Sequence, residues 1–256
     1  MNNIVFVGDS YCASYNNDSS LLKDQLSKDQ NSVTCQHKVS DDGIPCHPSL
    51  VANHFNCSLH PHGYGGKSWW YSRQKYRQFY LNAFSIDNTL AVIFFHTHPN
   101  RINNAWNDNL AKRLHDAVAI KQYYLEIHDP DYDNWACQQW FKEIAQEHTQ
   151  VKTIHFHCFP ETVKWSDLLP GMIYTTPLIH ISIGELTGTD TEIMNKSSTA
   201  EDRHNHLNEH NNRALSDIII HSIENYQPGQ QTIDLSKFQQ VNPNANRFPN
   251  LKFGTE

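Results

Sequence analysis

The chain has 256 residues, and its 20 lysines and arginines against 27 aspartates and glutamates give a formal net charge of −7. This length suits one α/β domain of ordinary size. The acidic balance argues against nucleic-acid binding, which needs a clustered basic surface, and no apolar run approaches the ~20 residues that span a bilayer. Histidine is frequent, with 17 copies, which indicates a metal site, a titrating active site or a compositional bias.

Short, continuous apolar runs predict the strands of a parallel sheet that is covered on both faces. In chain order these runs are residues 4–7, 56–62, 90–95, 151–159 and 178–183. The second is less clear because it is polar at both ends, and the last is the weakest.

Helical patterns lie between and after these runs, at residues 49–55, 68–84, 105–124, 134–148 and 208–225. In the last of them, Leu215, Ile219 and Ile223 share one face and Asn208 is a suitable N-cap. Strand–helix alternation of this kind predicts a three-layer α/β/α sandwich around a mostly parallel, flavodoxin-like sheet.

We expect one domain at residues 1–225, followed by a tail. A polar insertion at residues 11–46 follows the first strand and is much longer than a usual strand-to-helix connection. Residues 226–256 are polar and rich in proline and asparagine, which predicts a loosely packed tail or an assembly arm.

The beginning of the chain and its cysteines bear on the compartment. Met1-Asn2-Asn3 runs directly into an apolar segment, without the charged region and cleavage site of a secretory signal. The six cysteines are scattered and form no CxxC pair. We therefore expect reduced thiols and a cytoplasmic location, with association with a virus particle as the alternative.

Four polar blocks stand at strand ends or before the last helix, where open α/β sheets bind their ligands. In order, they are Gly8-Asp9-Ser10, then His62-Gly63-Tyr64-Gly65-Gly66-Lys67-Ser68, then His96-Thr97-His98-Pro99-Asn100-Arg101, and finally Asp202-Arg203-His204-Asn205-His206-Leu207-Asn208. Each one taken alone is ordinary turn chemistry.

In their order and context, these blocks resemble those of the SGNH (GDSL-type) serine hydrolases, with the divergent character of phage members. The resemblance covers the chain from Ile4 to about residue 225. The first block is similar to the family's nucleophile block, which implies that Ser10 is the nucleophile. Gly66 matches the glycine whose N–H helps to form the oxyanion hole, and His206 matches the catalytic histidine.

Two blocks depart from the family pattern. The third family block reads Gly-x-Asn-Asp, whereas His98 falls here where the asparagine donor stands, with Asn100 as the alternative donor. In the fourth block, Arg203 occupies the place of the family's aspartate. We therefore predict Asp202 as the acid, with Glu201 or a serine–histidine dyad as alternatives.

The chemistry that follows is hydrolysis of an ester, such as an O-acetyl group on a carbohydrate. Ser10 attacks the acyl carbonyl after His206 takes its proton, and Asp202 orients the imidazole. The N–H groups of Ser10 and Gly66, together with His98 or Asn100, hold the oxyanion.

The expected partner is a small-molecule or carbohydrate ester, with no nucleic acid, membrane or cofactor. Of the residues next to the blocks, Trp69 and Arg101 are predicted to contact the substrate, with Trp70 as the alternative to Trp69.

Two other readings of the sequence remain open. One is a catalytically inactive viral or structural protein that keeps the scaffold and binds through its loops or tail. The other is a metal-dependent hydrolase built on the HxH pairs, which are His60/His62, His96/His98, His155/His157 and His204/His206. No HExxH or cysteine-pair signature accompanies these pairs, so we expect no metal site.

Overall fold

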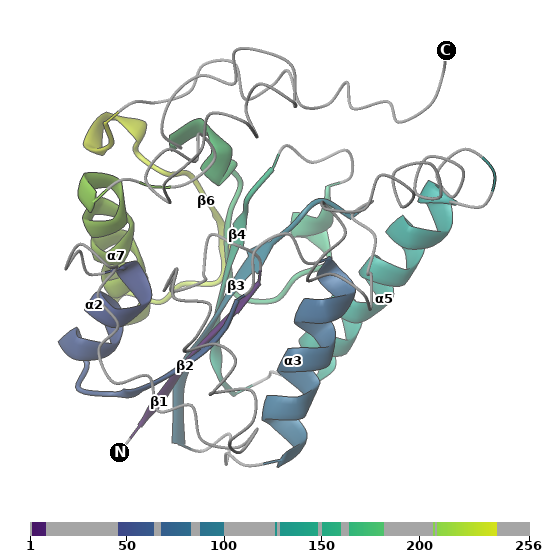
Figure 1. Ribbon diagram of the computed structural model, residues 1–256, viewed down its shortest axis with the longest axis horizontal. Coiled ribbons are helices and arrows are strands. Elements are labelled where there is room, and N and C mark those ends of the chain that lie inside the picture. Colours follow the sequence, from purple (N-terminus) through teal and green to yellow (C-terminus); the bar gives the residue numbers. More distant parts are fainter. Residues whose placement is uncertain are drawn as a thin grey trace, which may run out of the picture.

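The structure is a computed structural model that describes residues 2–8, 46–63, 68–82, 88–99, 126, 129–147, 150–159, 164–181, 207 and 209–239 (Figure 1). Most of the predicted insertion, the predicted helix at residues 105–124 and the N-cap candidate Asn208 lie outside these residues.

The described strands form one six-stranded sheet in which every neighbouring pair is parallel. Their order is β2-β1-β3-β4-β5-β6. The strands are β1 (Asn3–Gly8), β2 (Ser58–Gly63), β3 (Thr89–His96), β4 (Lys152–His157), β5 (Met172–Tyr174) and β6 (Gly229–Gln231). The first five follow the flavodoxin-like order, and β6 extends the sheet beyond β5.

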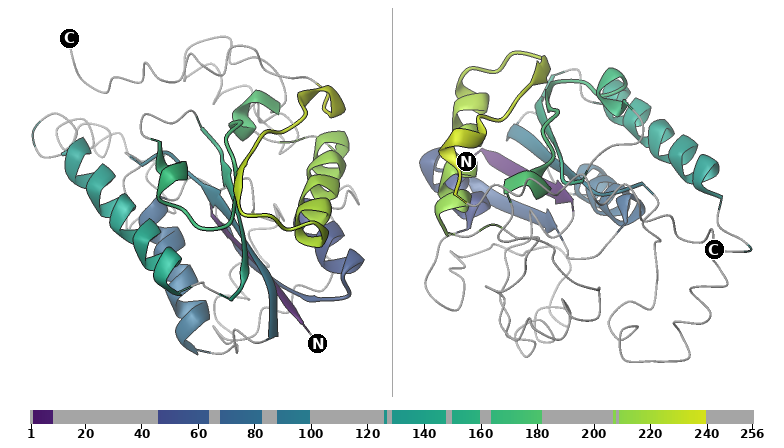
Figure 2. Two further views of the ribbon diagram at one scale, coloured as in Figure 1. Left: turned by 180° about the vertical axis from the view of Figure 1, so that it is seen from behind. Right: turned by 90° about the horizontal axis from the view of Figure 1, so that it is seen from above.

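Helices cover both faces of the sheet (Figures 1 and 2). One face carries α2 (His47–His54) and α7 (Glu209–Glu224), and the other carries α3 (Trp69–Asn82) and α5 (Pro130–Glu147). The predicted α/β fold with three layers is therefore confirmed. The predicted helix ends differ from the observed ones by one to four residues.

The largest of these differences is at the start of α5, four residues before the predicted start. Asp129 caps this helix, since its Oδ1 accepts hydrogen bonds from the backbone N–H groups of Asp131 and Tyr132. Pro130 takes the first helical position, where its missing N–H costs nothing. An aspartate followed by proline was thus the sequence signal for this helix start.

Two hydrophobic cores fill the space between the layers. Alternate residues of the central strands point to opposite faces, so that Phe6 and Phe95 join the core beneath α2 and α7. Val7 and Phe94 join the core beneath α3 and α5. This alternation explains why β1 and β3 read as unbroken apolar runs in the sequence.

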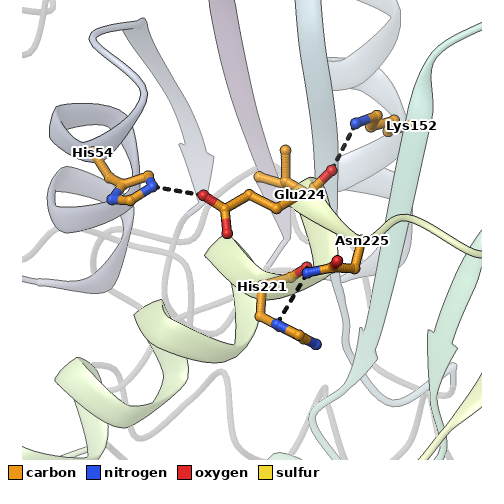
Figure 3. Close-up of polar contacts among 6 residues, drawn as sticks. His54, Lys152, His221, Glu224 and Asn225 are labelled. Atoms are coloured by element: carbon orange, nitrogen blue, oxygen red, sulfur yellow. Dashed lines mark hydrogen bonds and ion pairs between the residues drawn. The ribbon is translucent and has the colours of Figure 1, made fainter.

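The C-terminal end of α7 is bonded to residues at the amino-terminal edge of the sheet, where the strands begin (Figure 3). Lys152, the first residue of β4, donates from Nζ to the backbone oxygen of Ile223 at 2.6 Å, which satisfies an unpaired carbonyl at the helix end. His54 contacts Glu224 at 3.0 Å, which ties the end of α2 to the end of α7. The helix α7 therefore runs antiparallel to the strands, and it begins at the edge where the strands end.

The prediction of a strand at residues 178–183 is wrong. Leu178–Ile181 forms a 3₁₀ helix, and the fifth strand is the short segment Met172–Tyr174 instead. Leu178, Ile179 and Ile181 are nevertheless fully buried. The apolar run therefore predicted burial correctly but not the backbone conformation.

The predicted domain end at residue 225 is also wrong for residues 226–239. This segment contributes β6 to the sheet, and Ile233 and Phe238 are buried in the core beneath α7. The side chains of β6 are mostly exposed because it is an edge strand, and this accounts for its polar sequence. Residues 240–256 of the predicted tail lie outside the described residues.

We predict that Gly8→Ala destabilises the fold by about 3 kcal/mol, because a methyl group there meets the backbone of the neighbouring strand. An added Cβ would lie 2.3 Å from the backbone oxygen of Phe95. Urea unfolding measures the loss.

The control is Gly229→Ala. Gly229 also has a positive φ (133°, against 155° at Gly8), but no atom of the described residues lies within 4 Å of an added Cβ. Its expected cost is only about 1 kcal/mol, from backbone conformation alone. Equal losses in the two variants would contradict a close approach of β1 to β3.

Candidate functional site

The candidate site lies at the carboxyl edge of the sheet, formed by the ends of β1, β2 and β3. Gly8, the last residue of β1, pairs with Gly63 of β2 on one side and with Phe95 of β3 on the other. The first three polar blocks therefore leave the sheet side by side. In parallel sheets, ligands bind at this edge, near the point where the strand order reverses.

Of the predicted site residues, the structure describes His98 and Trp69. Those outside the described residues are Ser10, Gly66, Asn100, Arg101, Asp202 and His206. His98 follows β3 by two residues at the carboxyl edge and is half-buried, next to the buried Thr97. This position is compatible with the predicted role of His98 at the third block.

Leu207, the one residue of the fourth block that the structure describes, is held near the same edge by the first turn of α7. Nδ2 of Asn212 donates to the backbone oxygen of Leu207 at 3.1 Å. Oδ1 of Asn212 contacts Nδ1 of His47 at 2.9 Å and accepts from the backbone N–H of the same residue at 3.4 Å. The His47 ring in turn lies against Phe6 and Phe95, with centroid distances of 6.0 and 5.3 Å.

This hydrogen-bond network fixes the tautomer of His47. The carbonyl of Leu207 can only accept, so the amide nitrogen of Asn212 faces it and the amide oxygen faces His47. Nδ1 of His47 therefore carries the proton and donates. The other ring nitrogen, Nε2, is buried and has no hydrogen-bond partner among the residues that the structure describes.

Burial keeps the His47 imidazole uncharged. Desolvation lowers its pKa to about 4, against a smaller raising effect of the hydrogen bond to Asn212. His47 was not among the predicted site residues. The only local feature that marks it in the sequence is the pair His47-Pro48 at a helix start, and this pair is too common to indicate a functional residue.

On the opposite face, three histidines form a buried cluster beneath α5. Nε2 of His96 lies 2.9 Å from Nδ1 of His155, and the rings of His96 and His157 stack with centroids 5.3 Å apart. Phe94 stacks on His155, and Phe141 meets His96 edge-on. Burial, followed by the two neighbouring imidazoles, holds the pKa of His96 well below its ordinary value.

These histidines are core residues with aromatic neighbours. Within the described residues, no group of three or more histidines, cysteines, aspartates or glutamates is arranged to bind a metal ion. The pair His204/His206 lies outside those residues.

The aromatic residues after the second block divide between core and surface. Trp69 is 7% exposed and stacks on Trp140 with centroids 6.3 Å apart, so it belongs to the core beneath α3 and α5. Trp70 is 37% exposed, and the guanidinium of Arg73 lies 4.9 Å above its ring. The prediction of Trp69 as a substrate contact therefore needs correction, because Trp70 is the tryptophan that faces solvent.

Comparison with known protein families finds no family that matches the chain, and comparison with curated proteins finds no significant match. Among the helices that the structure describes, none combines the length and the apolar composition needed to cross a membrane.

We predict that Trp69→Ala lowers the free energy of unfolding by about 3–5 kcal/mol, because it empties a buried aromatic site. Trp70→Ala should change it by less than about 1 kcal/mol, the range of an exposed cation–π contact. Urea unfolding of the two variants measures the difference. A larger loss in Trp70→Ala would reverse the assignment of core and surface.

We also predict that stability falls in mild acid. In the unfolded chain, His47 and His96 become protonated near pH 6.5, whereas in the folded protein their pKa values are lower. The free energy of unfolding should therefore have its full value above pH ~6.5. It should decrease as the pH falls toward 4, by up to about 1.4 kcal/mol per pH unit for each histidine.

Urea unfolding between about pH 7.5 and pH 5 tests this dependence. The variant His47→Asn, which cannot titrate, should show a shallower slope. Equal stability of the wild type at both ends of this pH range would disprove the prediction.

Proposed function

We propose that the chain is a serine ester hydrolase of the SGNH type, with Ser10 as nucleophile and His206 as base. The observation that supports the proposal is that Gly8 of the first block, Thr97 and His98 of the third and Leu207 of the fourth all lie toward one edge of the sheet. Gly8 pairs beside Phe95, and the network from Leu207 through Asn212 to His47 ends on the ring of the same Phe95. Ser10 follows Gly8 by two residues, and His206 directly precedes Leu207.

The reaction proceeds through an acyl-enzyme. The Ser10 hydroxyl attacks the ester carbonyl while His206 accepts its proton, and the protonated imidazole then gives that proton to the leaving alcohol. A water molecule, activated by His206, cleaves the acyl-enzyme and restores Ser10. Asp202 orients the imidazole in this proposal.

The negative charge on the carbonyl oxygen needs hydrogen-bond donors at the carboxyl edge. We assign this role to the N–H groups of Ser10 and Gly66 and to the third block, where His98 or Asn100 is the side-chain donor. The half-buried position of His98 just past β3 supports its part in this role. Each such donor is typically worth ~3–4 kcal/mol of activation free energy.

The proposed substrate is a carboxylic ester of small size, such as an acetylated carbohydrate. The exposed ring of Trp70, near the start of α3, is suited to stack on a sugar. We further propose a cytoplasmic place of action. Within the part of the chain that the structure describes, Cys46, Cys57 and Cys137 form no disulfide, which is consistent with a reducing compartment.

We predict that the wild-type protein hydrolyses p-nitrophenyl acetate and that a fluorophosphonate probe modifies Ser10. Ser10→Ala should abolish labelling and lower kcat by at least about 10⁴-fold, because the covalent step is lost. Mass spectrometry of the labelled protein identifies the modified residue.

The matched control is Ser166→Ala, which removes a serine beside β6 at the opposite side of the sheet and should keep full activity. Asp202→Asn and Glu201→Gln, measured in parallel, identify the carboxylate that orients His206. A wild-type protein that neither turns over the ester nor reacts at Ser10 would refute the hydrolase and favour a binding protein on the same scaffold.

A further inference from the structure

One side-chain amide at the start of α7 connects three parts of the chain. Asn212 bonds to His47 through its oxygen and to the backbone of Leu207 through its nitrogen, at 2.9 and 3.1 Å. His47 and Asn212 are separated by 165 positions in the sequence. The amide is therefore the link between the start of α2, the start of α7 and the segment that precedes α7.

The His47 side of this link is rigid. The imidazole is only 2% exposed and is enclosed by the rings of Phe6 and Phe95, which belong to the two central strands. A ring held in this way cannot follow the amide if α7 shifts. Asn212 therefore transmits the position of the central strands to the Leu207 carbonyl.

We propose that Asn212 is a positioning residue of the site, which holds the backbone at Leu207, the residue that directly follows His206 in the sequence, at the carboxyl edge of the sheet. The catalytic meaning of this inference rests on the proposed function, whereas the positioning itself does not. A general base displaced by about 1 Å can lose about 10²-fold in rate, so the anchor of its neighbour matters.

Substitutions at position 212 can test the contact with His47 and the contact with Leu207 separately. In Asn212→Asp at about pH 8, the carboxylate still accepts from His47 but has no hydrogen to donate to the Leu207 carbonyl. Asn212→Ala removes both contacts. His47→Asn should preserve the link, because the amide nitrogen of the new side chain takes nearly the place of Nδ1.

Asn211 offers a matched control in the same helical turn. Its amide donates to the backbone oxygens of Ile181 and Gln239, both at 2.7 Å, and accepts from the backbone N–H of Gln239. Asn211 thus anchors α7 about as firmly as Asn212 does, but to other segments. A general loosening of α7 would affect both variants, whereas loss of positioning at Leu207 is specific to Asn212.

The deciding experiment is an NMR titration of the His206 imidazole, assigned by comparison with His206→Gln. In the wild type, Asn211→Ala and His47→Asn, we expect one common His206 resonance and pKa. In Asn212→Ala and Asn212→Asp, the His206 resonance should move away from this common position toward that of an unstructured histidine. An unchanged His206 resonance in both Asn212 variants overturns the inference.

Ester hydrolysis provides the second readout. We expect kcat to fall by at least about 10-fold in both Asn212 variants with KM nearly unchanged, since only the placement of the base is altered. An equal loss in Asn211→Ala would indicate a merely structural role and would count against positioning. If the wild type is inactive, the proposed hydrolase function fails, and the NMR titration alone decides the inference.

Discussion

The burial of β1 is the constraint on which the rest of the structure depends. All six residues of this strand are buried, and it lies between β2 and β3, so both of its faces need a cover of apolar side chains. The helices α2 and α7 supply one cover, and α3 and α5 supply the other. The space around β1 is therefore filled with apolar side chains, and the polar blocks of the sequence stand at the ends of the strands. This is why the candidate site lies at the carboxyl edge.

The many histidines of this chain do not share one purpose. His96, His155 and His157 fill a core position where aromatic residues would be expected, and they stack on one another and on Phe94. His47 is a buried connector between two helices and two strands. In each of these sites an imidazole acts as a flat ring, and those of His47, His96 and His155 also form hydrogen bonds. Histidine in this protein thus serves packing as well as chemistry, at the cost of stability in acid.

The central strands and most described helices were predictable because burial leaves a strong pattern. The apolar runs of β1, β3 and β4 and the striped face of α7 are such patterns. The strands β5 and β6 have only three residues each, and β6 is polar, so neither has a pattern of its own. Each of these strands is positioned by backbone pairing with the neighbouring strand of the sheet. A local sequence pattern cannot predict such pairing.

The polar blocks of the candidate site could be proposed from their order in the sequence, but the side chains that surround them could not be predicted. Trp69 and Trp70 are adjacent in the sequence, and which ring is buried depends on how α3 is rotated against α5. The contact between His47 and Asn212 joins residues far apart in the chain, so only the folded protein brings them together. Local sequence thus indicates which side chains carry chemistry, and the tertiary structure determines which ones support them.

In the proposed function, Ser10 and His206 act as one catalytic pair. The most direct measurement is the distance between Ser10 Oγ and the nearest imidazole nitrogen of His206 in a crystal structure of the protein with a bound fluorophosphonate or an ester analogue. We predict a separation within hydrogen-bond reach, about 3 Å. A separation beyond about 6 Å in that complex would contradict it.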